Sequence, residues 1–134
     1  MSVESTRAVI KRYLDSKHTD IGVMADDVVF TIMASGDEHK GPAGVGGMLH
    51  YMYHVAFDAD AETTNQILAD GKAVVEGYFV GTHIGEFAGI PATGKSVRVP
   101  LCVVYDLEND RITRGRVYME TPAMFAQLGE QPRG

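Results

Sequence analysis

Residues 72–119 read KAVVEGYFVGTHIGEFAGIPATGKSVRVPLCVVYDLENDRITRGRVYM, and this stretch carries the strongest signal for a fold. It holds three runs rich in β-branched and aromatic residues, at 72–87, 96–107 and 111–119, with glycine, proline, asparagine or aspartate between them. Runs of this composition predict strands, and the short connections predict that neighbouring strands pair antiparallel. The stretch therefore predicts three consecutive strands of a meander.

The sequence before this stretch adds a fourth strand. Residues 61–68 alternate loosely between apolar and polar, and Asp70-Gly71, a strong hairpin signal, joins them to the next run. The other predicted elements follow from helical spacing, β-branched composition and turn residues. They are a helix over 3–14, a helical turn over 20–25, a strand over 28–33, a loop over 35–42, a helix over 43–57 and a helix over 121–128. Helices followed by a four-strand antiparallel meander predict an α+β fold.

Composition restricts the domain count and the partners. With 134 residues, of which 45% are hydrophobic, the chain is long enough for one continuous core and too short for two ordinary ones. We expect a single domain over 1–129 and a loose tail over 130–134. The net charge is −6 with lysine and arginine scattered, whereas nucleic acids and anionic membranes are bound by basic patches. We therefore expect neither nucleic acid nor a membrane as a partner.

The cysteine content and the N-terminal residues bear on location. Cys102 is the one cysteine, so no intrachain disulfide can form, which is usual in a reducing compartment. Residues 1–16 carry charges throughout and lack the apolar core of a signal peptide. No run approaches the roughly 20 apolar residues of a membrane helix. We expect a cytoplasmic protein.

Residues 81–95, GTHIGEFAGIPATGK, resemble the GTHxGxFxGIPATGK segment of the SnoaL-like polyketide cyclase family. Further matches, in the order of the family, are Ala25-Asp26-Asp27-Val28, Arg111-Ile112, Tyr118-Met119-Glu120 and FAQLG at 125–129. The resemblance implies a nuclear-transport-factor-2-like fold, or cystatin-like roll. In this fold a strongly curved antiparallel sheet packs on N-terminal helices as a cone with a pocket at its open end. The family includes polyketide cyclases, epoxide hydrolases, ketosteroid isomerases, dehydratases and binders without activity, so the fold leaves the function open.

Strand alternation predicts which side chains line that pocket. Side chains alternate between the two faces of a strand, so the apolar positions of each run share one face. Together with residues of the helices and the first strand, the predicted substrate-binding residues are Phe30, Ile32, Tyr53, Phe79, Phe87, Leu101, Val103, Val117 and Met119. A mostly apolar wall suits a large hydrophobic small molecule held by few hydrogen bonds.

Three polar residues are the candidates for catalysis. His83 shares the apolar face, where an imidazole can act as general acid or base; the alternative is a structural histidine bonded to a backbone carbonyl. By the resemblance, Tyr105 stands where some polyketide cyclases carry a histidine, and Tyr13 stands where ketosteroid isomerases place an oxyanion-hole tyrosine. Either hydroxyl could stabilise a developing oxyanion, and packing in the core is the alternative for both.

Two glutamates are further acid/base candidates. Glu86 is three residues from His83, so the two face opposite sides of a regular strand unless Gly85 forms a bulge. Without a bulge, Glu86 is a solvated residue. Glu120 matches an acidic residue of the family but faces away from the predicted pocket, which indicates a structural role.

Neither a metal nor a cofactor is expected. His50 and His54 lie one helical turn apart, a spacing that can bind metal, but no aspartate or glutamate motif supports them. A surface or interface pair is therefore the favoured interpretation. Residues 41–47 are glycine-rich but lack the lysine and the serine or threonine of a phosphate loop.

These observations favour a cofactor-independent enzyme for acid/base cyclisation, isomerisation or dehydration of a polyketide-, terpenoid- or steroid-like molecule. The alternatives are a catalytically silent carrier of hydrophobic ligands and a dimerisation domain of the same fold. We expect a homodimer through the convex sheet face, because Cys102, Val104 and Tyr118 point away from the predicted pocket.

Two departures from the family lead to a negative prediction. By the resemblance, the last strand of cyclases and epoxide hydrolases carries an aspartate at the register of Val117, and ketosteroid isomerases place their base at that of Ile32. Neither side chain here can exchange a proton. We therefore predict negligible limonene-epoxide hydrolase and ketosteroid isomerase activity, and robust turnover in either standard assay would contradict this.

Overall fold

The computed structural model describes residues 1–129, so the tail predicted over 130–134 lies outside the described residues. Within them the chain forms α-helices, two short helical turns and strands. In order these are α1 (Val3–Asp15), the 3₁₀ turn η1 (Ile21–Val23), β1 (Met24–Ile32), β2 (Asp37–Lys40), α2 (Gly41–His50), the π-helical turn η2 (Tyr51–Val55), β3 (Phe57–Ala69), β4 (Lys72–His83), β5 (Ser96–Glu108), β6 (Arg111–Met119) and α3 (Thr121–Leu128). Each of these helices is too short or too polar to span a membrane.

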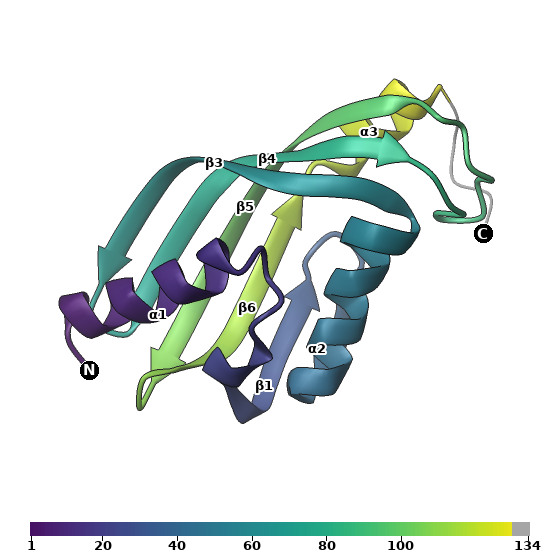
Figure 1. The fold of residues 1–134 in the computed structure, drawn as a ribbon. Coiled ribbons are helices and arrows are strands. Elements are labelled where there is room, and N and C mark those ends of the chain that lie inside the picture. The colour runs from purple at the N-terminus through teal and green to yellow at the C-terminus, as the bar shows by residue number, and fades with distance from the viewer. Residues whose placement is uncertain (130–134) are drawn as a thin grey trace.

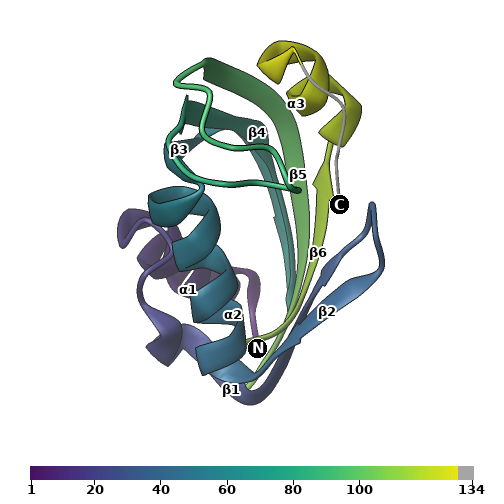
Figure 2. The ribbon, with the colours of Figure 1, turned by 90° about the vertical axis from the view of Figure 1, so that its right-hand side faces the viewer.

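The strands form one mixed sheet in the order β2-β1-β6-β5-β4-β3. β3 to β6 pair antiparallel with their neighbours in sequence, which confirms the predicted meander. β1 joins β6 in parallel, so the sheet is not wholly antiparallel as we expected. Parallel pairing needs a long connection, which the local pattern of β1 cannot reveal. The predicted α+β fold is confirmed: Figure 1 shows a strongly curved, open sheet, and Figure 2 shows α1 and α2 on the same side of it.

Two glycines of β4 let the backbone of β3 lie unusually close to it. A Cβ atom at Gly77 would lie 1.9 Å from the Glu62 carbonyl oxygen, and one at Gly81 would lie 2.4 Å from the Asp58 carbonyl oxygen. Both separations are far shorter than a van der Waals contact, so only glycine fits. A bulge in β3 lies beside Gly77. The glycines and the bulge together allow the outer strands to bend over the concave face.

The alternation predicted for β5 is confirmed. Every second residue from Val97 to Leu107 is buried, with Leu101 half-buried. These side chains contribute to two hydrophobic clusters, one beneath α1 and one near α3. The first includes Ile10, Tyr13, Val28, Phe30, Tyr105 and Ile112, and the second includes Phe57, Phe79, Ile90, Val99, Met124 and Leu128. Leu49 and Leu101 pack against both clusters, so the core is continuous.

Residues 35–42, predicted as a loop, contain a strand. β2 pairs with β1 after a turn at Gly36, which has a φ of 80°. The sequence of β2 is DEHK, and it lacks apolar alternation because this edge strand is mostly exposed. The turn residues are thus the one feature of this segment that the sequence pattern predicts, and β2 is missed. The helix predicted over 43–57 is also corrected, since α2 begins at Gly41 and η2 replaces its last turn.

The strand predicted over 72–87 ends at His83. The N–H groups of Ile84 and Gly85 donate to the Ala56 carbonyl, and Ala88 and Gly89, with φ values of 50° and 79°, form a turn between the bridged residues Phe87 and Ile90. Glu86 and Phe87 therefore belong to the loop that follows β4, and their predicted strand positions are wrong. The predicted exposure of Glu86 to solvent is confirmed.

A charge cluster on the convex face should make the fold sensitive to acid. Arg116 donates to both carboxylate oxygens of Asp106 at 3.0 and 3.1 Å, and Lys72 Nζ lies 2.6 Å from Oδ1. These bonds, that of Arg116 first, lower the pKa of Asp106 to about 2. Because the folded pKa lies below the ordinary value of 3.8, the stabilisation is present above about pH 4 and is lost as the pH falls towards 2.

We therefore expect Asp106→Asn to lower the free energy of unfolding by about 1–2 kcal/mol at pH 7 and by progressively less towards pH 2. Urea unfolding of both proteins across this pH range measures the difference. A cost that stays equal at all pH values would contradict the assignment to the Asp106 charge.

Candidate functional site

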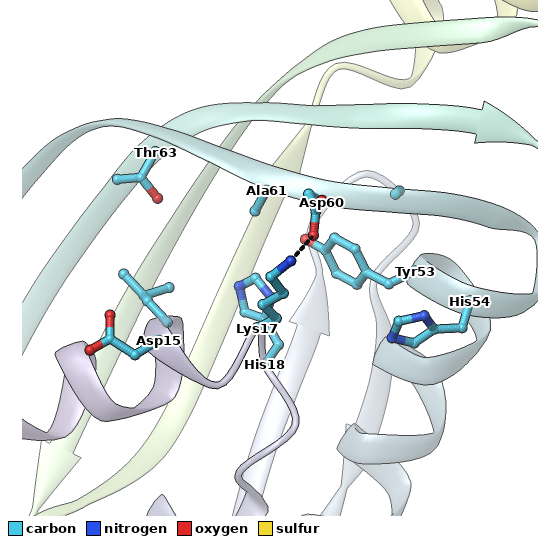
Figure 3. Close-up of a pocket in the computed structure, with 10 residues that line it drawn as sticks. Asp15, Lys17, His18, Tyr53, His54, Asp60, Ala61 and Thr63 are labelled. Carbon is cyan, nitrogen blue, oxygen red and sulfur yellow. Dashed lines mark ion pairs between the residues drawn. The ribbon is translucent and has the colours of Figure 1, made fainter.

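A depression of about 380 Å³ lies between the end of α1, the turn η2 and the edge strand β3. Its walls combine apolar residues with acidic, basic and imidazole side chains, as Figure 3 shows. They are Leu14, Asp15, Lys17, His18, Tyr53, His54, Ala59, Asp60, Ala61 and Thr63. Of the substrate-binding and catalytic residues predicted from the sequence, Tyr53 lines this depression.

The turn after α1 places Lys17 and His18 over the depression. Lys17 (φ 55°) and His18 (φ 64°) have a left-handed backbone. Their N–H groups donate to the carbonyls of Leu14 and Tyr13 at 2.9 and 3.1 Å. This conformation costs about 1–2 kcal/mol for a residue with a side chain, and such strain is frequent at functional sites. Hydrogen bonds to the end of α1 hold the strained turn in place.

Lys17 covers part of the mouth of the depression. Its Nζ lies 3.6 Å from Asp60 Oδ1 on β3, as the dashed line in Figure 3 shows. The two side chains are 76% and 68% exposed, and an ion pair of this exposure contributes at most about 1 kcal/mol. The pair therefore bridges α1 and β3 without locking them together.

His18 lies between two tyrosines. Its ring stacks on Tyr53, with centroids 5.0 Å apart and planes at 16°, and it meets the ring of Tyr13 edge to face at 5.0 Å. Tyr53 comes from η2, and π-helical turns are rare and frequent at functional sites. Burial lowers the pKa of His18 to about 4, against smaller opposing effects of the Lys17 backbone and Asp60. The imidazole is therefore neutral at pH 7 and can accept a proton.

We expect the ring resonances of His18 to titrate near pH 4 in an NMR pH series, with the assignment made by His18→Asn. The folded pKa lies below the unfolded value near 6.5, so the folded state binds fewer protons between the two. This contribution to stability is present above about pH 6.5 and is lost as the pH falls to about 4. His18→Asn should therefore lose less stability than the wild type across that window. A ring that titrates near 6.5 would show that His18 is solvated in solution.

Two buried hydroxyls lie beneath the stack. The rings of Tyr13 and Tyr105 meet edge to face with centroids 5.9 Å apart, and both side chains are buried. Burial raises the pKa of both hydroxyls. The neighbouring Tyr105 and then Tyr53 raise the pKa of Tyr13 further, and Tyr53 raises that of Tyr105. Within residues 1–129, Tyr13 Oη has no hydrogen-bond partner of normal geometry, although the Tyr105 hydroxyl lies close enough to interact with it. A buried, neutral phenol of this kind can donate a hydrogen bond to an anionic oxygen.

His83, predicted as a catalytic residue, lies outside this constellation. It is fully buried at the end of β4, where its Nδ1 lies 3.0 Å from Thr93 Oγ1 and accepts the Thr93 N–H at 3.2 Å. Its ring packs 5.1 Å from that of Phe57 in the cluster near α3. Because Nδ1 accepts, the neutral ring carries its proton on Nε2, which has no partner in the described part of the chain. A catalytic role for His83 stays a prediction.

The other predicted residues are dispersed over the domain. Seven of the predicted substrate-binding residues are buried or half-buried along the sheet, namely Phe30, Ile32, Phe79, Leu101, Val103, Val117 and Met119. Phe87 packs in the loop after β4 against the rings of Phe57 and Phe125. Glu86 is exposed in the same loop, where its carbonyl accepts a hydrogen bond from the Tyr51 hydroxyl. Glu120 is exposed immediately before α3, away from the depression.

The histidine pair predicted at the surface is exposed. The rings of His50 and His54 lie 5.5 Å apart, and His54 contributes to the wall of the depression. In the part of the chain that the structure describes, no group of three or more histidine, cysteine, aspartate or glutamate side chains is suited to hold a metal ion.

The sequence alone missed Lys17, His18 and Asp60. His18 stands in the segment SKHTD at 16–20, just past the first helix, where helical spacing no longer predicts the direction of a side chain. The one available signal was a histidine directly after an amphipathic helix whose apolar face carries Tyr13.

The comparisons with known proteins match a family and a fold. The family model described as SnoaL-like polyketide cyclase matches residues 16–128. A candidate SnoaL-like polyketide cyclase from Jannaschia sp. CCS1 superposes with a TM-score of 0.85 at 17% identity, over 96% of this chain and 94% of that one. TsrD from Streptomyces laurentii gives a TM-score of 0.80 at 19% identity, over 96% and 97% of the two chains. A protein with a ketosteroid isomerase-like fold from Catenulispora acidiphila gives 0.76 at 16% identity, over 95% and 96%. No curated protein matches the chain.

Proposed function

The chain belongs to the SnoaL-like polyketide cyclase family, and we propose that it carries out an acid/base step, without a cofactor, on a hydrophobic small molecule. The step is a cyclisation, isomerisation or dehydration of a polyketide-, terpenoid- or steroid-like ketone. The observation that carries the proposal is the buried, unpartnered hydroxyl of Tyr13 among the residues described, beside Tyr105 and close to a pocket of ligand size.

The pocket suits a small organic ligand. Its volume of about 380 Å³ falls within the range of about 300–1,000 Å³ that is usual for such sites. Behind it the wall continues as aromatic rings, since Tyr53 packs 5.2 Å from Phe79 and Tyr105 packs 6.0 Å from Phe30. The lining offers apolar surface on Leu14, Tyr53, Ala59 and Ala61, and the polar and charged side chains around them would orient a ligand.

The polar groups suit the proton transfers of enolisation. In this step a base removes a proton from the carbon next to a carbonyl, and negative charge develops on the carbonyl oxygen. Tyr13 and Tyr105 would donate to that oxygen, because their raised pKa values keep both hydroxyls protonated. Neutral His18 would accept the proton and return it to the product, so that the step is a net rearrangement or loss of water without a change of oxidation state.

The test follows exchange of the protons next to the carbonyl. Purified protein is mixed with hydrophobic ketones in D₂O, and mass spectrometry measures deuterium uptake. We expect uptake above the buffer rate with the wild type and loss of this excess in His18→Asn. Tyr118→Phe, on the convex face, is the matched control with an unchanged rate. Ketones that raise the melting temperature but show no catalysed exchange would favour the carrier alternative.

His83 is the second candidate for the proton transfer, motivated by its buried Nε2. If it is catalytic, His83→Ala should lower kcat by about 10²–10⁴-fold. Thr93→Val removes the hydroxyl that contacts Nδ1 and keeps the ring. Equal losses of stability in both variants with kcat unchanged would assign His83 a structural role.

We also propose a cytoplasmic homodimer that pairs its convex sheet faces. Tyr118 is 45% exposed there, and the half-buried Cys102 pairs with it across β5 and β6. Light scattering over a concentration series tests the assembly, and a strict monomer at high concentration would reject it.

The register of the sheet supports the prediction of negligible limonene-epoxide hydrolase and ketosteroid isomerase activity. Ile32 on β1 and Val103 on β5 flank Val117 on β6. The two positions at which relatives carry an acid are thus neighbours, and both are hydrocarbon here. Val117→Asp should lower stability, since a carboxylate placed among these side chains loses solvation without gaining a partner.

A further inference from the structure

Two depressions meet at the stack of His18 and Tyr53. The first, of about 380 Å³, opens between α1 and β3, and the second, of about 210 Å³, extends to Leu49 on α2. Both are lined by Lys17, His18, Tyr53 and His54. The stacked rings therefore form the partition between the two spaces.

The imidazole of His18 has the contacts that a planar ligand would make at this position. It lies face to face with Tyr53 at 5.0 Å and meets the ring of Tyr13 edge to face at 5.0 Å. Offset and edge-to-face contacts of this kind stabilise any planar ring, whatever its chemical identity. Close by, Tyr13 Oη is buried with no hydrogen-bond partner in residues 1–129. A ligand ring that carried an acceptor oxygen would satisfy this hydroxyl, which lowers the cost of its burial.

The surroundings of the His18 turn oppose a movement of its side chains only weakly. Lys17 and His18 are both left-handed without being glycine, and strained turns of this kind are frequent at functional sites. The ion pair between Lys17 and Asp60 joins two largely exposed side chains and opposes the movement weakly. Figure 3 shows Lys17 and His18 on the same turn, facing β3 across the mouth.

We propose that His18 determines the specificity of this pocket, because its ring occupies the place of a planar ring of the ligand. A planar aromatic molecule with a carbonyl or phenolate oxygen displaces the imidazole towards the mouth, stacks on Tyr53 and accepts a hydrogen bond from Tyr13. The two depressions then form one continuous site. This inference rests on the pocket of the proposed function, but it concerns binding and requires no turnover.

Binding of two probes tests the proposal. Acetylnaphthalene has a planar ring and a carbonyl, and ethylnaphthalene has nearly the same shape without the oxygen. We expect His18→Gly to bind both about tenfold more tightly than the wild type, because the ring no longer has to be displaced. Glycine also fits the left-handed backbone at this position. His18→Asn, which tolerates the same backbone and lacks a ring, should show the same change, and His39→Asn on β2 should match the wild type.

The preference for the ketone probe tests the hydrogen bond separately. His18→Gly should prefer acetylnaphthalene, and the double variant His18→Gly/Tyr13→Phe should bind both probes equally. In the wild type, the NMR resonances of the His18 ring should lose their ring-current shifts when acetylnaphthalene binds. Unchanged affinity in both His18 variants, His18 resonances that stay in place, or no binding by any variant would each overturn the proposal. Probe binding as expected, without catalysed proton exchange, would instead count against the proposed function alone.

Discussion

Tyr13→Phe should raise the free energy of unfolding by about 1 kcal/mol and lower kcat by about 10²–10³-fold once a substrate is in hand. The expected gain in stability follows from burial, since Tyr13 Oη is buried with no partner in the described residues. An unsatisfied buried hydroxyl costs about 1–3 kcal/mol, and phenylalanine keeps the ring and its contacts with Tyr105 and His18. The expected loss of activity follows from removing one donor to a developing oxyanion.

Tyr13→Phe should thus change stability and activity in opposite directions. This makes the test decisive, because a core tyrosine that only packs would leave kcat unchanged. Urea unfolding and steady-state kinetics of the same preparation measure the two effects. Tyr118→Phe is the matched control for activity, since that side chain is 45% exposed on the convex face and should leave kcat unchanged. A Tyr13→Phe protein with lower stability and full activity would show that the hydroxyl is bonded in solution and takes no part in the reaction.

Gly77→Ala should lower the free energy of unfolding by on the order of 3 kcal/mol or more. The new Cβ would lie 1.9 Å from the carbonyl oxygen of Glu62, 2.8 Å from its carbonyl carbon and 3.0 Å from the Cα of Thr63. All three atoms belong to the backbone of β3, so no side-chain rotation can relieve the overlap. β3 must move away from β4, which breaks inter-strand hydrogen bonds and shifts Asp60 at the mouth of the pocket.

Gly47→Ala is the control for this substitution. A Cβ atom there meets nothing within 4 Å, and alanine favours the helix α2 over glycine by about 1 kcal/mol. The two variants therefore carry the same chemical change with opposite expected signs in urea unfolding. A loss below about 1 kcal/mol in Gly77→Ala would show that the edge strand adapts at little cost.

Local periodicity predicted most of the strands, and it predicted the buried orientation of two tyrosines near the site. The alternation of 96–107 placed Tyr105 on the buried face, and the helical spacing of 3–14 placed Tyr13 there, because the direction of a side chain within a regular element follows from its neighbours. β2 escaped prediction for the same reason, since an exposed edge strand reading DEHK has no buried face to mark. The end of β4 at His83 depended on a distant segment, because the N–H groups of Ile84 and Gly85 both donate to the carbonyl of Ala56.

The α+β class, the meander, the family and the inward direction of Tyr13, Tyr53 and Tyr105 were all present in the linear order of residues. The position of His18 was not. Its ring meets Tyr53, thirty-five residues later, only because the turn after α1 and the turn η2 pack at the same end of the curved sheet. Such contacts depend on how separate elements assemble and not on any repeat within one element. For that reason the chemistry at the mouth of the pocket, including the neutral imidazole and the ion pair between Lys17 and Asp60, follows from tertiary packing, which no local pattern of the sequence encodes.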